Sequence, residues 1–569
     1  MRYLALACDY DGTIATHGIV DDATLSALER VKESGRRLIL VTGRHLPDLI
    51  STFSRTDLFD RVVAENGALL YTPSAREEKT LGDPPPASFV EELERRGVVP
   101  SLGRVIVATW QPHETTVLDV IRDLGLELQV IFNKGAVMVL PSGVNKATGL
   151  TAALKSMELS AHNVVGVGDA ENDHAFLNLC ECSAAVENAL PVLKERADLV
   201  TSRSHGAGVV ELIERLITSD LEELNDKLSR HHLQLGRREQ GEEFRIPPYG
   251  LNVLIAGTSG GGKSTLATGF LERLCDAGYQ FCIIDPEGDY QSLEISVPIG
   301  DSRTPPAVKE VLELLKRSDQ NAAVNLLGLP LHDRPSFFEK LLPMLQEARA
   351  RTGRPHWIVV DETHHLIPTA WEVGNLTLPR SLSGMLMITV HPEQVSPKAL
   401  AFVDLIISIG TTPAHTIADF AKILGLPAPP VSATQLKSGE GIAWWPKKGI
   451  DPFWFRSIPP RAEHRRHIRK YAEGDLGDER SFHFIGPKKK LKLRAQNLMI
   501  FLQIADGVDD KTWKHHLQNG DYSRWFRDMI KDEELAAEAA QIEGFKGLSP
   551  DESRARIRAA IERRYTAPA

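Results

Sequence analysis

A glycine-rich segment in the middle of the chain has the residue types needed to hold a phosphate chain. It follows the apolar run 253–256, which fits a buried strand, and it precedes a predicted helix over 265–274. Glycines let backbone N–H groups close around phosphates, Lys263 can reach the β and γ oxygens, and the Ser264 hydroxyl can ligate Mg²⁺. The pattern predicts a nucleotide-binding loop (P-loop) made of Gly257, Thr258, Ser259, Gly260, Gly261, Gly262, Lys263, Ser264 and Thr265.

Two acidic residues follow another apolar strand further along the chain. The strand 357–360 ends in Asp361 and Glu362. Asp361 is suited to hold Mg²⁺ directly or through water, and Glu362 to polarise the water that attacks a γ-phosphate. A further strand, 385–388, leads into 389–396, where a polar side chain could sense that phosphate.

Carboxylates also gather near the N-terminus, again at predicted strand ends. The strand 3–8 delivers Asp9 and Asp11, and the strand 164–167 leads to Asp169 and Asp173. The strand 38–41 ends in Thr42, and Lys146 opens a predicted helix. Carboxylates crowded at one sheet edge repel one another unless a divalent cation lies among them, and hard oxygen ligands suit Mg²⁺.

These four motifs, in this order over about 215 residues, resemble the haloacid dehalogenase (HAD) superfamily. The resemblance implies a Rossmann-like domain in which Asp9 takes the phosphoryl group as an aspartyl-phosphate. Asp11 would act as general acid and then base, and Thr42 and Lys146 would hold the phosphoryl oxygens. The implied Mg²⁺ ligands are Asp9, the Asp11 carbonyl, Asp169 and Asp173.

The residues between the second and third motifs are too many for a simple crossover, and they predict a small α+β cap over about 75–142. This cap resembles those of sucrose-phosphatases, mannosylglycerate-phosphatases and archaeal phosphoglycolate-phosphatases. The resemblance implies a small phosphorylated metabolite or a phosphorylated nucleic-acid end as substrate. Candidate substrate contacts are Arg44, Asn66, Trp110 and His113; cap core or surface is the simpler interpretation of the last two.

The central motifs, from the P-loop through residues 285–290 and 361–365 to 389–396, resemble the HerA/FtsK class of P-loop ATPases. The resemblance implies a RecA-like domain that hydrolyses ATP, a homo-oligomeric ring such as a hexamer, and DNA or protein as partner. Arg380 is a candidate arginine finger. Two features depart from the class: the usual sensor glutamine is replaced around 389–391, and a phosphatase-like domain stands where a small β-barrel is usual.

The fold class is therefore α/β, in three parts joined by a linker. We expect a phosphatase domain over 1–220, a helical and polar linker over 221–243, an ATPase domain over 244–445 and a mostly helical region over 446–569. No apolar run is long enough for a membrane span and no cleavable signal pattern is present, so a cytoplasmic protein is expected. Five scattered cysteines do not form a zinc motif, and the net charge of −10 argues against a uniformly basic surface.

The C-terminal region mixes basic and aromatic residues. Residues 461–494 contain eleven Lys or Arg against five Asp or Glu. Such a segment can bind a phosphate backbone and stack bases, although a solvated connector explains it equally well. Helices are expected over 491–506 and 510–530.

Three functions fit these features. The first is a bifunctional phosphatase and ATPase that processes nucleic acid, and the second is a metabolite phosphatase with a regulatory or scaffolding ATPase domain. The third resembles polynucleotide kinase–phosphatase. Glu362 beside Asp361 argues against a kinase, which must keep water from being activated at the γ-phosphate.

Overall fold

The computed structural model describes residues 1–569 except 134, 226, 259, 370–382, 432–435, 462–470, 472–475, 477–479, 487–491, 531, 546 and 566–569. The chain forms two compact units. The first unit comprises Met1–His232, Leu315–Asp319 and Leu342–His356, and the second comprises Leu233–Leu314, Gln320–Leu341 and Trp357–Ala569.

An eight-stranded sheet forms the centre of the first unit. Its strand order is β12-β11-β10-β1-β2-β3-β4-β5, parallel from β12 to β3 and antiparallel beyond. The strands are β1 (Ala5–Cys8), β2 (Arg37–Val41), β3 (Arg61–Ala64), β4 (Leu69–Thr72), β5 (Glu77–Thr80), β10 (Val164–Gly168), β11 (Cys182–Ala185) and β12 (Leu199–Val200). Because the central strands are parallel, the residues that follow β1, β2 and β10 meet at one edge of the sheet.

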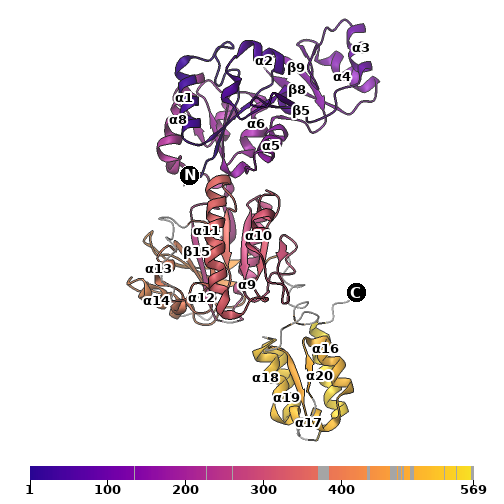
Figure 1. Ribbon diagram of the computed structural model, residues 1–569, viewed down its shortest axis with the longest axis vertical. Coiled ribbons are helices and arrows are strands. Elements are labelled where there is room, and N and C mark those ends of the chain that lie inside the picture. Colours follow the sequence, from indigo (N-terminus) through magenta and orange to yellow (C-terminus); the bar gives the residue numbers. More distant parts are fainter. Residues whose placement is uncertain are drawn as a thin grey trace. The chain divides into compact units, whose positions relative to one another are not determined.

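Helices surround this sheet, with α1 and α8 side by side (Figure 1). They are α1 (Asp22–Glu33), α2 (Leu46–Thr52), α5 (Lys146–Ser156), α6 (His174–Leu179), α7 (Pro191–Arg196) and α8 (His205–Ser219). Leu28 of α1 and Leu212 of α8 are fully buried in the same core. The helices therefore shield the parallel strands from water, as such sheets require.

The cap is a separate four-stranded antiparallel sheet with two helices. The sheet order is β6-β7-β9-β8. Its elements are β6 (Ser101–Leu102), β7 (Val107–Trp110), β8 (Leu128–Asn133), β9 (Ala136–Pro141), α3 (Ala87–Arg95) and α4 (Glu114–Asp123). Phe89, Val117 and Val139 lie in a small core of its own, which confirms the expected α+β cap.

The second unit is built on an eleven-stranded sheet of order β14-β13-β23-β22-β21-β15-β20-β19-β16-β18-β17. Neighbouring strands are antiparallel from β14 through β21 and parallel from β21 to β17. They are β13 (Leu233–Arg238), β14 (Glu243–Ile246), β15 (Asn252–Gly257), β16 (Phe281–Asp285), β17 (Val297–Ile299), β18 (Ala322–Asn325), β19 (Trp357–Val360), β20 (Met385–Thr389), β21 (Leu405–Ile409), β22 (Glu440–Trp445) and β23 (Ile450–Ser457). The helices that lie wholly in this unit are α9 (Lys263–Asp276), α12 (Thr363–Leu366), α13 (Pro397–Leu400) and α14 (Pro413–Ile423). Helix α10 (Val308–Leu315) belongs to it except for its last residue, and α11 (Arg334–Thr352) belongs to it up to Leu341 and to the first unit from Leu342.

The expectation of a helical linker from residue 221 is wrong. The described residues there form two short 3₁₀ turns, Glu222–Leu224 and Ser229–His231, and then strand β13. Leu233 and Leu235 alternate into the core of the second unit. Strand β13 pairs with β14 and with β23, so from residue 233 onward burial with period two replaces the predicted helix.

A helical bundle ends the chain around one aromatic core. It contains β24 (Phe482–Ile485), β25 (Lys492–Ala495), α16 (Leu498–Gly507), α17 (Asp510–Asn519), α18 (Asp521–Asp528), α19 (Glu533–Gly544) and α20 (Pro550–Tyr565). Phe501, Trp513 and Tyr522 are buried together. The helix expected from residue 491 begins only at Leu498, because 492–495 pair with β24.

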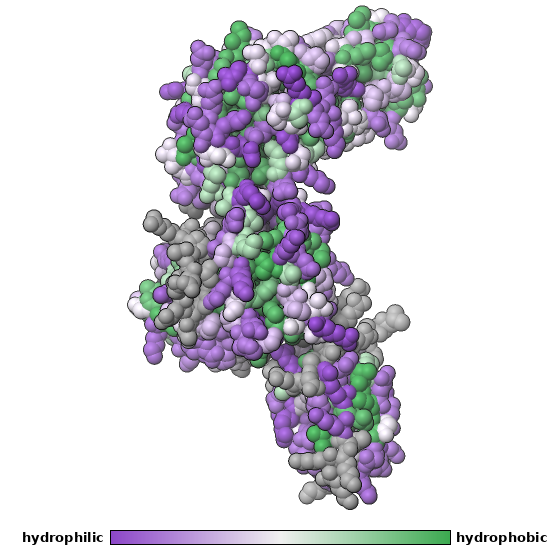
Figure 2. Space-filling view, in the orientation of Figure 1, coloured by the Kyte–Doolittle hydropathy of each residue, from purple (hydrophilic) through white to green (hydrophobic). Residues whose placement is uncertain are grey.

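Most of the visible surface is hydrophilic, as expected when the apolar residues form the cores (Figure 2). Figure 2 shows hydrophilic residues over most of the visible face, with apolar residues scattered among them. Within the described residues, none of the helices combines the length and the hydropathy that crossing a bilayer requires.

Candidate functional site

The carboxyl edge of the first sheet brings three predicted carboxylates together. Side-chain oxygens of Asp9, Asp169 and Asp173 lie within 4.8 Å of one another, and all three residues are buried. Thr13 Oγ1 lies 3.2 Å from both Asp9 Oδ2 and Asp169 Oδ1. Backbone N–H groups of Asp169 and Ala170 donate to Asp173 Oδ2 at 2.9 Å and so fix that carboxylate. The donor set and its spacing fit a hard divalent cation such as Mg²⁺.

Lys146 is the cation that the structure places among these carboxylates. Its Nζ donates to Asp9 Oδ1 at 2.5 Å and to Asp173 Oδ1 at 2.6 Å, and the residue is 1% exposed. Burial and the charge of Asp173 raise the pKa of Asp9 to about 7, with Lys146 acting in the opposite direction. Bringing in a divalent cation would favour the ionised, nucleophilic carboxylate.

Asp11 and Thr42 both contact Arg44. Arg44 binds both oxygens of the Asp11 carboxylate, at 2.6 and 2.7 Å, while the Asp11 side chain stays 41% exposed. Thr42 is buried, and its hydroxyl oxygen accepts from the Arg44 backbone N–H at 3.1 Å. The predicted contact Arg44 is thus a neighbour of Asp11, and its guanidinium sets the orientation of that carboxylate.

Three consecutive residues after β3 position the site, and of these only Asn66 was predicted as a substrate contact. Glu65, Asn66 and Gly67 all have positive φ, at 52°, 54° and 106°. The Glu65 carboxylate accepts backbone N–H groups of Arg104, Val105 and Ile106 at 2.8, 2.8 and 3.1 Å, which ties the cap to the core. Asn66 Oδ1 accepts from Asn172 Nδ2 at 3.0 Å. The run of polar residues with a glycine was the only signal in the sequence.

Gly67 lets the chain approach the residues that precede Lys146. A Cβ on Gly67 would lie 1.9 Å from the carbonyl oxygen of Asn145. Gly67→Ala is therefore expected to destabilise the first unit by about 1–3 kcal/mol and to lower phosphate release, because the backbone at Lys146 must move. Thermal unfolding followed by circular dichroism measures the first effect.

Gly35→Ala is the matched control for that substitution. Gly35 has φ of 86°, and nothing lies within 4 Å of the position of its Cβ. The control carries the backbone strain without the collision. Equal loss of stability in the two variants would show that close packing at Gly67 is unimportant.

The P-loop lies between β15 and α9, as predicted. Lys263 is 7% exposed, and its Nζ donates to the carbonyl oxygens of Gly257 and Thr258 at 3.1 Å each. Burial lowers the pKa of Lys263, opposed by Glu362 and Asp361. Gly257 must lack a side chain because a Cβ would lie 1.9 Å from the Ile409 carbonyl oxygen on β21. Ser259, which was predicted to belong to the P-loop, lies outside the described residues.

Asp361 and Glu362 follow β19, one strand away from the P-loop strand, with β20 between them. Asp361 Oδ1 accepts the Glu362 backbone N–H at 2.9 Å, and Glu362 takes the left-handed φ of 40°. Burial and Glu287 raise the pKa of Glu362. Glu362 Oε2 is buried and makes no hydrogen bond among the described residues; its neighbour His364 Nδ1 lies 3.5 Å away.

Arg480 was not predicted for this site from the sequence, whereas Thr389 begins the predicted phosphate-sensing stretch 389–396. Arg480 Nη2 lies 2.5 Å from Glu287 Oε1, and the charges of both act on Glu362. The hydroxyl of Thr389, at the end of β20, lies 3.0 Å from His364 Nδ1. Burial, His365 and His391 lower the pKa of His364 to about 4, so this ring is neutral near pH 7. The link between Arg480 and Glu287 spans almost two hundred residues and has no local signal.

The remaining candidates are not gathered into these sites. Trp110 ends β7 with 66% of its surface exposed, and His113 precedes α4 without a side-chain cap bond. Both agree with the simpler interpretation of cap surface. Arg380 and much of 461–494 lie outside the described residues.

Comparison with known proteins agrees with both resemblances. The haloacid dehalogenase-like hydrolase family matches residues 6–91 and 111–213, and the central domain of helicase HerA matches residues 251–353, a range that ends before Asp361. A phosphoglycolate phosphatase of Methanothermobacter thermautotrophicus is 34% identical over 223 residues, which cover 37% of this chain and 98% of that protein. Phosphoglycolate phosphatase 2 of Saccharolobus solfataricus is 29% identical over 229 residues, 38% of this chain and 94% of that protein.

The matched relatives thus align almost over their whole length with the domain that holds Asp9, Lys146, Asp169 and Asp173. The chain belongs to the haloacid dehalogenase-like hydrolases through its N-terminal domain, to which a HerA-like central domain is fused.

Proposed function

We propose that the N-terminal site hydrolyses phosphate monoesters through an aspartyl-phosphate on Asp9. The observation that carries this proposal is the position of Lys146 between Asp9 and Asp173. An Asp9 oxygen attacks phosphorus, the ester oxygen leaves, and Asp11 gives it a proton. Asp11 then takes a proton from the water that attacks the acyl-phosphate, which releases phosphate and regenerates Asp9. Mg²⁺ held by Asp9, Asp169, Asp173 and the Asp11 carbonyl would neutralise the phosphoryl charge.

The substrate we propose is a small phosphorylated acid of the phosphoglycolate type. The names of the matched relatives support this, as does a cap that Glu65 fastens over the site. Asn66 Nδ2 is buried without a hydrogen-bond partner among the described residues, so it can donate to a bound substrate.

A panel of phosphate esters tests the substrate. The kcat/KM for phosphate release from phosphoglycolate is expected to exceed that for sugar phosphates and for 5′- or 3′-phosphorylated oligonucleotides by at least about tenfold. One well-placed polar contact between enzyme and substrate is enough to produce a difference of this size. Preference for oligonucleotide ends would instead favour a nucleic-acid-processing enzyme.

We propose that the central domain hydrolyses ATP with Mg²⁺ held by Ser264 and Asp361, and with Glu362 as the base. Two observations support this assignment. The Glu362 Oε2 atom is buried without a hydrogen bond among the described residues, and Lys263 is buried in the P-loop. We propose a homo-oligomeric ring for this domain, as for its HerA-like relatives.

A DNA motor and a regulatory or scaffolding domain predict different responses of ATP turnover to DNA. A motor on DNA gives ATP turnover that DNA stimulates and that falls steeply with salt. A regulatory or scaffolding domain gives turnover that is indifferent to DNA and changes with the phosphatase substrate. The fusion to a domain whose matched relatives are phosphoglycolate phosphatases favours the second role.

A further inference from the structure

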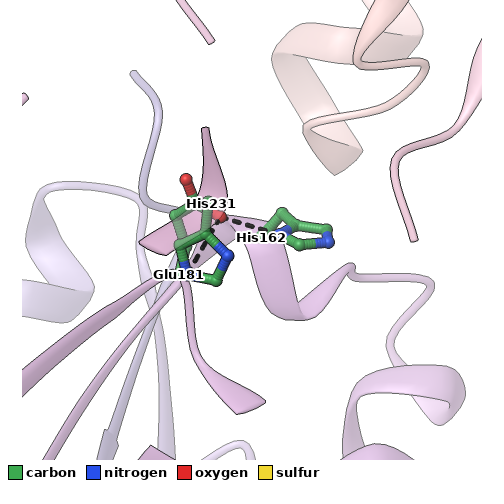
Figure 3. A group of neighbouring side chains, drawn as sticks. All are labelled: His162, Glu181 and His231. Atoms are coloured by element: carbon green, nitrogen blue, oxygen red, sulfur yellow. Dashed lines mark hydrogen bonds and ion pairs between the residues drawn. The ribbon is translucent and has the colours of Figure 1, made fainter. Parts of the chain in front are cut away.

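A cluster of two histidines and a glutamate lies at the edge of the first sheet opposite the phosphatase site. Glu181 stands just before β11, and His162 lies in the 3₁₀ turn Ala161–Asn163 before β10. These positions are the amino ends of parallel strands, whereas Asp9 and Asp169 follow the carboxyl ends. His231, from the turn Ser229–His231, completes the cluster (Figure 3). The catalytic proposal uses none of these residues.

The two rings converge on a single carboxylate oxygen. His162 Nδ1 lies 2.7 Å from Glu181 Oε2, and His231 Nε2 lies 3.9 Å from the same atom. One potential ligand atom from each residue lies within 4.8 Å of the others. The Glu181 side chain is 1% exposed, while those of His162 and His231 are 11% and 16% exposed. A small ion could therefore enter past the rings.

One potential ligand atom of the cluster, His231 Nε2, is buried and makes no hydrogen bond among the described residues. Burial lowers the pKa of His231, which favours the neutral ring with a lone pair. A buried ring nitrogen that points at a carboxylate without a hydrogen bond calls for a further partner.

The surroundings hold Glu181 ionised and limit the total charge. Burial opposes ionisation, but the hydrogen bond from His162 and the charge of Arg2 lower the pKa of Glu181 below its usual range. Arg2 Nη2 binds Glu181 Oε1 at 2.5 Å, leaving Oε2 toward the rings. Arg230 is paired with Asp198 at 2.9 Å, so the nearby charges cancel in pairs.

We propose that His162, Glu181 and His231 form a binding site for Zn²⁺ or a similar borderline divalent cation, with water as a fourth ligand. Two imidazoles and one carboxylate are a common zinc ligand set. A tetrahedral site with bonds of about 2.1 Å needs ligand atoms about 3.4 Å apart, between the distances of the two contacts made here. Mg²⁺ prefers oxygen ligands and six-fold coordination, so it does not compete well for this site.

The ion would tie together three chain segments that are distant in sequence. His231 is two residues before β13, where the sequence passes into the second unit. The ring of His356 packs edge-on against His162, with centroids 5.7 Å apart, and restricts its rotation. Zinc would stabilise this packing and leave the phosphatase and ATPase chemistry to Mg²⁺.

Binding of Co²⁺ and Zn²⁺ to the full-length chain, purified without a histidine tag and kept in millimolar Mg²⁺, tests the site. Co²⁺ should give the intense visible bands of a tetrahedral site with nitrogen ligands, and Zn²⁺ should abolish them at one equivalent per chain. Zn²⁺ should also raise the melting temperature. His231→Ala and His231→Gln should weaken binding by at least about tenfold and remove both effects.

His332→Ala is the matched control, because the side chain of His332 is 82% exposed and lies outside the cluster. It should bind like the unmodified chain. Absence of saturable tetrahedral binding by the unmodified chain would overturn the proposal. Equal binding by both folded His231 variants, shown by unchanged circular dichroism, would overturn it as well.

Discussion

Asp9→Asn is expected to abolish phosphate release from monoesters, by at least about a thousandfold, and to leave ATP hydrolysis unchanged. An amide nitrogen cannot attack phosphorus, whereas the similar shape keeps the contact with Thr13. The substitution also removes one charge from a buried carboxylate group, so no loss of thermal stability is expected. Steady-state phosphate release with phosphoglycolate, and ATP turnover of the same preparation, measure both activities.

Thr56→Ser, a conservative change at a buried position away from the carboxylates, serves as the control and should keep both activities. Residual phosphatase activity above about a tenth of the unmodified rate in Asp9→Asn would contradict a covalent intermediate on Asp9. Loss of ATP hydrolysis in the same folded variant would contradict the independence of the two sites.

Glu362→Gln is expected to show the reverse pattern. ATP hydrolysis should fall by about a hundredfold or more, because glutamine cannot accept a proton from the attacking water. Nucleotide binding should persist, since the phosphate-binding Lys263 and the backbone position fixed by Asp361 Oδ1 are retained. Single-turnover hydrolysis and equilibrium binding of a fluorescent ATP analogue separate the two effects.

Lys263→Ala provides the contrast, because it should weaken binding itself. Phosphatase activity should be unchanged in both variants. If Glu362→Gln bound ATP and hydrolysed it at the unmodified rate, Glu362 would not be the base, and Glu287 beside Arg480 would become the next candidate.

The sequence was informative wherever chemistry depends on residues next to a strand end. Asp9, Asp169 and Asp173 could be brought together in advance because a parallel sheet places its carboxyl ends at one edge. The P-loop was predictable for the same reason, since its glycines, Lys263 and the flanking strand are contiguous in sequence.

Contacts between distant segments could not be predicted in this way. The carboxylate of Glu65 finds its three N–H donors some forty residues away, and Arg480 reaches Glu287 across a still longer separation. From residue 233 onward, a strand replaces the helix expected from 221, because β23, contributed by residues 450–457, provides a sheet edge with which β13 pairs. Local periodicity contains no information about such an edge.

Trapping the covalent intermediate tests the central claim most directly. The full-length chain is mixed with ³²P-labelled phosphoglycolate and Mg²⁺, quenched in acid within milliseconds, digested and mapped by mass spectrometry. Label on the peptide that contains Asp9, and none when γ-labelled ATP replaces the ester, is the predicted result. Turnover of the ester with no label on Asp9, or with label on another residue, would contradict the account.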